Sequence, residues 1–376
     1  MQTTIQIPTI DPMPVPAPIW LVQGLLLLTF FLHVVAMNFT VGGGVLAFVN
    51  GVRGRKNEFA AQLSRDLARK LPVLLSFTIT LGIAPLLFVQ VFYGQLFYSS
   101  SILMASVWLS VIPLLIVAYY GIYYFSLRGE KSRSAGVGAL AIAMALLLMI
   151  GFIYVNNMTL ALTPDRWFSI YRQDASGWNL NLGDRSVPPR YLHMMISAVA
   201  IGGLLPVIMG VRKRDTDYGQ WMLRHGAMWF IVPTVLNYII GTWYLMALPR
   251  DVRMLFGGGN MLGTALLAMG MVLPLAALFH MMFAGGARKP VLHASLGIGS
   301  ALLSVAIMIV MRDIARHGYL APHFKLSQLA TTPNWGIIVL FLGTFVAGVA
   351  TLWWMGAKVM AAHKPESVPA GKVANA

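Results

Sequence analysis

The sequence contains no cysteine, and this excludes disulfide bonds, iron–sulfur clusters and covalently attached haem c in the chain. Any cofactor must therefore be held by histidine, methionine or a carboxylate. Charged residues are also scarce, at 10% of the 376 residues against roughly 25% in a soluble domain. Because 58% of the residues are hydrophobic and long apolar runs recur from end to end, the sequence predicts a polytopic membrane protein.

Carboxylates are especially few. The chain has twelve Asp and Glu residues, and all of them fall in stretches that we predict to be loops or tails. Proton pumps and ion-coupled transporters usually need carboxylates inside their membrane spans. We therefore expect no proton delivery to a buried catalytic centre. A secondary transporter is disfavoured further because no inverted repeat is visible.

Nine apolar runs of helix length, separated by charges and helix breakers, predict an all-α membrane bundle. A tail at 1–18 has five prolines and no Lys or Arg, so it lacks the basic start of a signal peptide. We expect one transmembrane bundle at 19–357 and a polar tail at 358–376. The predicted spans are Ile19–Asn50, Leu71–Tyr93, Ile102–Phe125, Val137–Asn157, Tyr191–Val211, Ala227–Leu248, Met261–Phe283, Val291–Met311 and Trp335–Met355.

The basic excess of +15 is distributed unevenly between the predicted loops. The loops after the first, third, fifth and seventh spans, with the final tail, carry 18 Lys and Arg, and the opposite side carries 9. The positive-inside rule then predicts an outer N-terminus and a cytoplasmic C-terminus. The positive charge is thus an orientation signal and a contact with the lipid bilayer, and it does not indicate nucleic-acid binding.

One histidine stands out in the stretch RYLHMMISAVAIGGLL, where His193 lies just inside the membrane boundary. A histidine there is costly unless something binds it, and a neutral imidazole is a good ligand for haem iron. The small residues that follow are expected to let a flat ligand approach the backbone; they are Ser197, Ala198, Ala200, Gly202 and Gly203. A histidine that is hydrogen-bonded at the interface is the alternative.

The other histidines divide by side of the membrane. His33 shares a helix face with Met37 in the outer half of the first span. His225, His280 and His293 fall near cytoplasmic helix ends, where they form either a second cofactor site or, more commonly, interfacial anchors. His317 and His323 are expected to be surface residues of the last outer loop.

Several stretches, taken in order, resemble subunit I of cytochrome bd-type quinol oxidases. The run LTFFLHVVAMNFTVGGGVLAF, from Leu28, is similar to the first helix of that subunit, and LGIAPLLFVQVFYG, from Leu81, to the second. RYLHMMISAVAIGG resembles the fifth helix, which carries a low-spin haem b histidine. MRDIARHGY resembles the charged end of the eighth helix at Asp313 and Arg316. Nine helices with an outer N-terminus agree with that family.

This resemblance implies one or two haem b groups. His193 would be an axial ligand of a low-spin haem, with Met261 as its partner and Met254 or Met269 as the alternatives. His33 would match the histidine that holds the oxygen-reacting haem. The arginines expected to bind haem propionates are Arg190, Arg253 and Arg316, with Arg185 nearby.

The chain departs from the family at carboxylates in three helices. Gln90, apolar residues near Ile116 and a position at about Ala306 stand where the family has acids. The Gly-Arg-Gln-Pro-Trp run is absent from the eighth-helix loop, and the loop between the sixth and seventh spans is too short for the family's quinol-binding segment. We therefore expect that the middle haem has lost its ligand and that oxygen is not reduced.

The sequence thus predicts a bd-like b-type cytochrome of the bacterial inner membrane. It would move electrons between membrane quinol and an outer redox partner, either a c-type cytochrome or a second membrane subunit. One alternative is an authentic cytochrome bd quinol oxidase subunit I that reduces oxygen to water. Another is a haem-free membrane transporter or scaffold.

Overall fold

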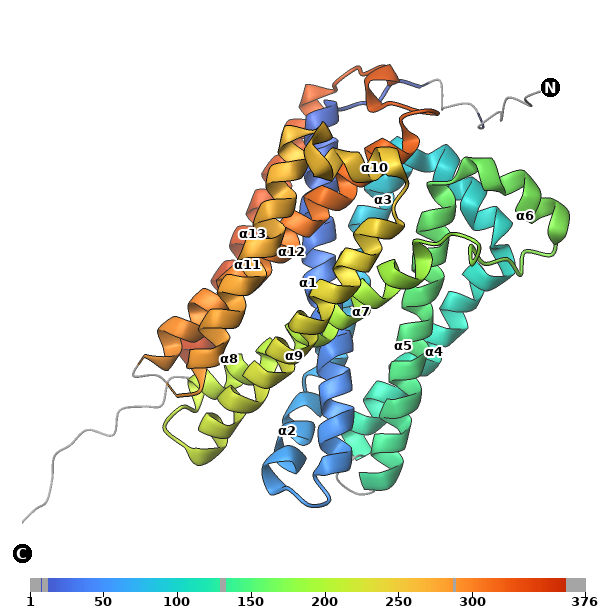
Figure 1. Cartoon of the computed structure of the whole chain (residues 1–376). Coiled ribbons are helices and arrows are strands. Elements are labelled where there is room, and N and C mark those ends of the chain that lie inside the picture. The colour runs from blue at the N-terminus through green and yellow to red at the C-terminus, as the bar shows by residue number, and fades with distance from the viewer. Residues whose placement is uncertain (1–7, 9–12, 129–132, 287–288, 363–376) are drawn as a thin grey trace, which may run out of the picture. The chain divides into compact units, whose positions relative to one another are not determined.

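The computed structural model describes residue 8 and residues 13–128, 133–286 and 289–362. All long secondary-structure elements of these described residues are helices (Figure 1). Nine of the described helical segments are long and apolar enough to cross a membrane, which confirms the predicted all-α membrane bundle. The spanning elements are α1 (Ile19–Arg53), α3 (Leu71–Leu103), α4 (Ala105–Arg128), α5 (Arg133–Ala161), α7 (Val187–Gly202) with α8 (Leu204–Arg212), α9 (Asp217–Ala247), α11 (Met261–Ala284), α12 (Pro290–Leu320) and α13 (Trp335–Ala362).

The chain divides into two compact units. Unit 1 comprises Met1–Asp11 and Val22–Gln328, and unit 2 comprises Pro12–Leu21 and Leu329–Ala376. The sequence-based boundaries at residues 19 and 357 remain predictions. Each unit is described separately below.

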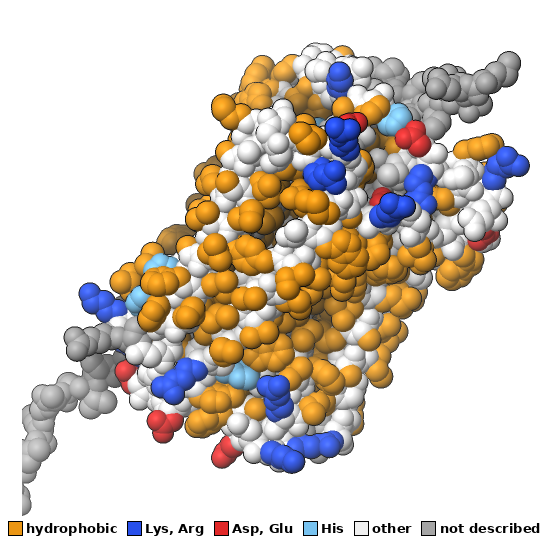
Figure 2. All heavy atoms as spheres, in the orientation of Figure 1, with side chains coloured by type: hydrophobic (Ala, Val, Ile, Leu, Met, Phe, Trp, Pro, Cys, Tyr) orange, Lys and Arg blue, Asp and Glu red, His pale blue; other side chains and the backbone are white. Residues whose placement is uncertain are grey.

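Two hydrophobic clusters hold the helices of unit 1 together. The first joins α1, α3, α4 and α5 through side chains such as Leu46, Leu71 and Leu140, and the second joins α8, α9, α11 and α12 through side chains such as Leu204 and Met281. α4 lies beside α5, and α11 beside α12 (Figure 1). On the face drawn in Figure 2, hydrophobic side chains cover the middle of these helices, and many Lys and Arg side chains lie toward the helix ends. This distribution suits an apolar bilayer between two aqueous surfaces.

α1 and α7 cross at unusually close range. A Cβ on Gly42 would overlap the backbone carbonyl of Ala198, and a Cβ on Gly202 would lie 2.5 Å from the Gly42 Cα atom. Gly203, where α7 gives way to α8, meets the backbone of α9 near Phe230 in the same way. The expectation that these small residues accommodate a ligand is therefore wrong for Ala198, Gly202 and Gly203, because they contact neighbouring helices. Ser197 and Ala200 do line a cavity.

Short helices occupy the connections of unit 1. α2 (Glu58–Ala68) begins at Asn57, whose side chain accepts a hydrogen bond from the Ala60 N–H, and it buries one apolar face in the first cluster. α6 (Trp167–Gln173) lies in the long connection after α5. α10 (Arg250–Met254) continues into a π-helical turn, η2 (Leu255–Gly259), in which Gly258 has a φ of 107°. This backbone conformation favours glycine and sets the direction in which α11 begins.

Several helices extend beyond their predicted spans. α3 continues past a non-helical residue at Tyr93 as far as Leu103, and α12 continues to Leu320. Asp313 therefore lies inside a candidate membrane span and is only 4% exposed. The prediction that every carboxylate lies outside the spans is wrong for Asp313, because ion pairing lets a charged helix end stay buried, and for Asp217, which is the first residue of the candidate span in α9. His317 likewise belongs to α12 and not to a surface loop.

In unit 2, the N-terminal segment pairs with the residues before α13. Val15 forms a parallel bridge with Thr331, and its N–H donates to the Ala330 carbonyl at 2.8 Å. The Asn334 N–H donates to the Pro16 carbonyl at 2.9 Å. The predicted tails at 1–18 and 358–376 lie partly outside the described residues. Most described side chains of α13 are exposed, as expected for a helix that faces lipid.

Candidate cofactor site

A large cavity lies inside unit 1, between α1, α7, α9, α11 and α12. We call it the main cavity; its volume is about 320 Å³. Pockets for small ligands usually measure roughly 300–1,000 Å³ and are mostly apolar. The wall of the main cavity is mostly apolar, and its polar side chains are Asn38, Arg190, His193, Ser197, Thr234, Asn237, Tyr238, Thr242, Tyr244, Ser304 and Arg312.

His193 lines this cavity from α7. Its Nδ1 atom is buried and makes no hydrogen bond within 3.5 Å among the described residues, although the Asn237 side chain lies close enough to act on the ring. The ring lies against α9 where Gly241 leaves room, since a Cβ there would be 3.1 Å from the His193 Cε1 atom. Nearby, the Asn237 Nδ2 group donates to the Ser197 Oγ atom at 2.6 Å. A buried, unpaired imidazole nitrogen at the wall of a large cavity is a candidate ligand position, because leaving it unpaired costs free energy.

The apolar lining of the main cavity and this histidine are compatible with a haem. A second iron ligand would have to come from another helix. Met37, Met271, Met308 and Met311 all line the cavity from α1, α11 or α12. Met311 packs against the cluster of Leu248, Val252, Phe256 and Ala315, and Met37 packs against the cluster of Val41, Met195 and Ala198, so all four methionines remain candidates.

The structure does not bring Met261 into this cavity. Met261 is the first residue of α11, and it is 89% exposed. Leu267, Gly270, Met271 and Pro274 form the face of α11 that lines the cavity. Residues three and four apart share a helix face, and Met261 falls outside this set. Met254 and Met269 are about half exposed and also lie outside the cavity lining.

His33 occupies a separate position between α1 and α3. Its Nδ1 atom lies 3.0 Å from the Thr78 carbonyl oxygen, within hydrogen-bonding distance. A Cβ on Gly82 would lie 2.9 Å from the His33 Cε1 atom, so glycine makes room for the ring. His33 does not line the main cavity, although Met37 on the same helix does.

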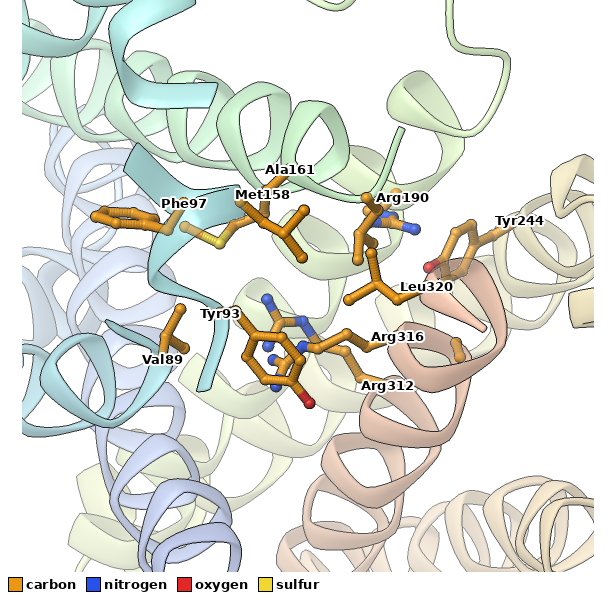
Figure 3. Close-up of a pocket in the computed structure, with 13 residues that line it drawn as sticks. Val89, Tyr93, Phe97, Met158, Ala161, Arg190, Tyr244, Arg312, Arg316 and Leu320 are labelled. Atoms are coloured by element: carbon orange, nitrogen blue, oxygen red, sulfur yellow. The ribbon is translucent and has the colours of Figure 1, made fainter. Parts of the chain in front are cut away.

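Three arginines gather where the main cavity meets a second, smaller pocket (Figure 3). We call the smaller one the outer pocket; its volume is about 40 Å³. Arg190 and Arg312 line both spaces, and Arg316 lines the outer pocket. Arg190 is 9% exposed, and its Nε atom has no hydrogen-bond partner among the described residues. Buried arginines with free donors are suited to carboxylate groups.

Aromatic rings and one carboxylate hold these arginines in place. The Arg190 guanidinium lies over the Tyr244 ring at 5.3 Å, and that of Arg312 lies over the Phe30 ring at 4.5 Å. The Arg316 Nη1 group donates to the Asp313 Oδ1 atom at 3.1 Å. Among the described residues, this is the one ion pair that these three arginines form.

The predicted arginine set is thus only partly brought together. Arg190 and Arg316 lie at the two spaces, whereas the Arg253 Nη1 group donates to the Met246 carbonyl at 3.1 Å and Arg185 is exposed. Arg312 was missed by the sequence reasoning. Its spacing of four from Arg316 would have placed both on one helix face, had α12 been extended to Leu320.

The inner histidines form no cluster that could hold a metal. His225 stacks on Trp221 at 4.3 Å and accepts a hydrogen bond from the Trp229 Nε1 group at 3.0 Å. The Nδ1 atoms of His280 and His293 are 3.2 Å apart. The described residues contain no group of three or more potential metal ligands of the His, Cys, Asp or Glu type. Aromatic partners of this kind are typical of interfacial side chains.

No protein-family model and no curated protein sequence matches the chain. Three chains of solved structures do match it. One of them belongs to "The structure of bd oxidase from Geobacillus thermodenitrificans", with a TM-score of 0.69 and 10% sequence identity, and the match covers 94% of this chain and 100% of that chain. At this identity the likeness concerns the fold. The helical bundle of this chain has the fold of a bd oxidase chain.

Proposed function

We propose that the chain is a bd-like, b-type membrane cytochrome that takes electrons from membrane quinol and passes them to a redox partner on the outer face. The observation that carries this proposal is the buried, unpaired His193 nitrogen at the wall of the main cavity. The bd oxidase fold supports it at a coarser level. Haem bound in the cavity would supply an iron that alternates between two oxidation states.

The residues of the chain have separate tasks in this proposal. His193 and one of the cavity methionines, Met37, Met271, Met308 or Met311, would hold the iron. A haem held by histidine and methionine would supply electron-transfer chemistry. Arg190 and Arg312 would bind the propionates through charge-assisted hydrogen bonds. The apolar wall keeps water away from the ring.

The arginines sit at the helix ends that we assign to the outer face from the charge distribution. The propionate edge of the haem would then point toward that face, where a soluble or membrane-bound acceptor can approach. The acceptor is proposed to be a c-type cytochrome or a second subunit, because a chain without cysteine cannot hold haem c itself.

We propose that the chain does not reduce oxygen. Gln90, apolar residues near Ile116 and a position at about Ala306 stand where the resembled family carries acids. Asp313 is a buried carboxylate, so the argument that the spans contain no carboxylate no longer holds for it. Its side chain is, however, paired with Arg316, in the part of the bundle where the three arginines gather. The measurement is oxygen consumption by the purified complex with quinol as donor. Rapid turnover, with this chain as the only haem subunit, would favour the oxidase instead.

The visible spectrum of the purified protein tests the haem assignment. We expect a low-spin haem b spectrum that His193→Ala abolishes. His323→Ala is the control, because His323 lies 3.5 Å from Asp165 and outside the main cavity. A colourless parent protein would support the haem-free transporter or scaffold.

Haem stoichiometry in His33→Ala tests for a second haem. Loss of one haem per protein would support a second haem at His33, and an unchanged haem content would assign His33 to its contact with Thr78.

A further inference from the structure

We propose that the outer pocket binds a chloride-sized inorganic anion in the haem-free chain, and that the propionates of haem displace this anion. The first half of the inference depends only on the residues of the pocket, whereas the second half rests on the proposed function. Three features of the structure carry it. They are the way in which the arginine side chains are held, the positive charge that they leave unbalanced, and the small volume of the outer pocket.

Arg190 is held by contacts with aromatic rings, which leave hydrogen-bond donors free. Its guanidinium carbon lies 5.3 Å from the centre of the Tyr244 ring and 5.9 Å from the centre of the Tyr319 ring. A ring covers the flat face of a guanidinium group, whereas the N–H groups point outward in its plane. The Arg190 Nε atom has no hydrogen-bond partner among the described residues, and the residue is 9% exposed. A buried donor without a partner at the wall of a pocket indicates a ligand.

Arg312 and Arg316 line the outer pocket from one face of α12 and are held in the same manner. The Arg312 guanidinium carbon is 4.5 Å from the centre of the Phe30 ring, and that of Arg316 is 4.9 Å from the centre of the Tyr93 ring. Both arginine side chains reach toward Tyr93 (Figure 3). Like charges one helical turn apart repel each other, and burial strengthens the repulsion. An anion in the outer pocket would relieve it.

The described carboxylates near the outer pocket do not neutralise the three arginines. Asp313 forms an ion pair with Arg316 at 3.1 Å. Asp184 attracts Arg190, but from beyond the distance of an ion pair. Arg312 has no ion-pair partner among the described residues, so at least one positive charge is left unbalanced. A buried charge without a partner is costly, and a bound anion would remove that cost.

The volume of the outer pocket restricts the anion to a small inorganic ion. The pocket measures about 40 Å³, and roughly 10–15 Å³ on the same measure holds one water molecule. The space therefore admits a chloride ion with a water molecule and excludes an organic acid or a lipid headgroup. Val89, Leu96 and Phe97 form an apolar part of the wall, which disfavours ions of higher charge such as sulfate. Chloride accepts hydrogen bonds from any direction, so it suits donors that converge from α7 and α12.

Haem and the anion would compete for the same arginines. Arg190 and Arg312 line both the main cavity and the outer pocket. Two propionates bound from the main cavity would balance the remaining positive charge and remove the attraction for chloride. Chloride would thus stabilise the haem-free chain, and haem would release it. Because the coupling between two ligands is reciprocal, each would lower the affinity for the other by the same factor.

Equilibrium dialysis of the haem-free, full-length chain against radiolabelled chloride tests the site directly. Sodium gluconate keeps the ionic strength constant, so that screening of the arginines does not change with the chloride concentration, and gluconate is too large for the outer pocket. We expect saturable binding of one chloride per chain. Haemin added to the chloride-loaded chain should then release the label. Absence of saturable binding would overturn the inference.

Two substitutions locate the bound chloride. Arg312→Gln should weaken chloride binding by about ten- to a hundredfold, the effect expected when one hydrogen bond to a charged group is lost. Its control is Arg253→Gln, since Arg253 lines neither space. Ala161→Leu fills the outer pocket without changing its charge and should abolish binding, whereas Ala145→Leu, at an exposed position of the same helix, should not. Parent affinity in both Arg312→Gln and Ala161→Leu would place the chloride elsewhere and overturn the assignment.

Thermal unfolding of the unmodified, haem-free chain keeps the test decisive if the variants do not fold. Replacing gluconate by chloride at constant ionic strength should raise the unfolding temperature, because a ligand that binds only the folded state stabilises it. An unchanged unfolding temperature would count against the site. Failure of the proposed function is a different result: the chain would bind chloride but no haem. Haemin that binds while chloride stays bound would overturn the competition between them.

Discussion

A methionine can bind haem iron only if its helix is rotated so that the sulfur faces the ring. Met261 is exposed, whereas Met308 lines the main cavity beside Gly270, where a Cβ would lie 3.2 Å from the Met308 Cε atom. We expect Met261→Ala to leave the low-spin spectrum unchanged. Among Met37, Met271, Met308 and Met311, one change to alanine should give a high-spin spectrum or a lower potential. A high-spin Met261→Ala protein would restore the assignment made from the sequence.

Arg312 should contribute to the free energy of haem binding, although it lies far from His193 in the sequence. It lines both the main cavity and the outer pocket, and its guanidinium lies over the Phe30 ring. Hydrogen bonds to charged groups contribute roughly 1.5–3 kcal/mol, so Arg312→Gln should weaken haem binding by about ten- to a hundredfold. Haem release to an apo-acceptor protein measures this. Arg253→Gln, which leaves the cavity intact, should behave like the parent; equal losses in both would contradict the proposed role.

At the scale of helices, the contact between α1 and α7 depends on glycine at position 42. Gly42→Ala would push its Cβ into the Ala198 carbonyl, and overpacking of this kind typically costs about 1–3 kcal/mol. The expected result is a lower unfolding temperature in detergent together with partial loss of haem, because His193 lies on the displaced helix. Gly24→Ala is the control on the same helix, since no heavy atom lies within 4 Å of its Cβ position. Identical unfolding temperatures would contradict the close contact.

The helices themselves were predictable, but their rotations and some of their ends were not. Hydropathy located all nine spans of the described residues, and the sequence singled out His193, which lines the main cavity. It failed for Met261, because a helix that is apolar on every side has no polar face to indicate its rotation. Hydropathy also predicted that the eighth span ends at Met311, before the first charged residue. The helix in fact continues, because Asp313 and Arg316 pair with each other and stay buried. Pairing of this kind depends on contacts that a single sequence does not display.

For the whole molecule, the charge distribution predicts the orientation in the membrane. The 18-to-9 split of Lys and Arg places the arginine cluster and the outer pocket on the outer side. A reporter fused after the last residue should therefore be active only if it works in the cytoplasm. Activity of a reporter that folds only outside the cytoplasm would reverse the orientation, and with it the side of the membrane on which the arginine cluster lies.

The unpaired groups in the main cavity also bear on how much of the protein a cell accumulates. Without a ligand, the His193 Nδ1 and Arg190 Nε atoms are buried without partners, and each such group typically destabilises a fold by about 1–3 kcal/mol. Binding that satisfies both adds its free energy to that of folding. Cells starved of haem precursors should therefore contain less of this protein at equal synthesis rates, as quantified by immunoblot. Cofactor supply would then act as quality control, and unloaded chains would be the ones that proteases remove.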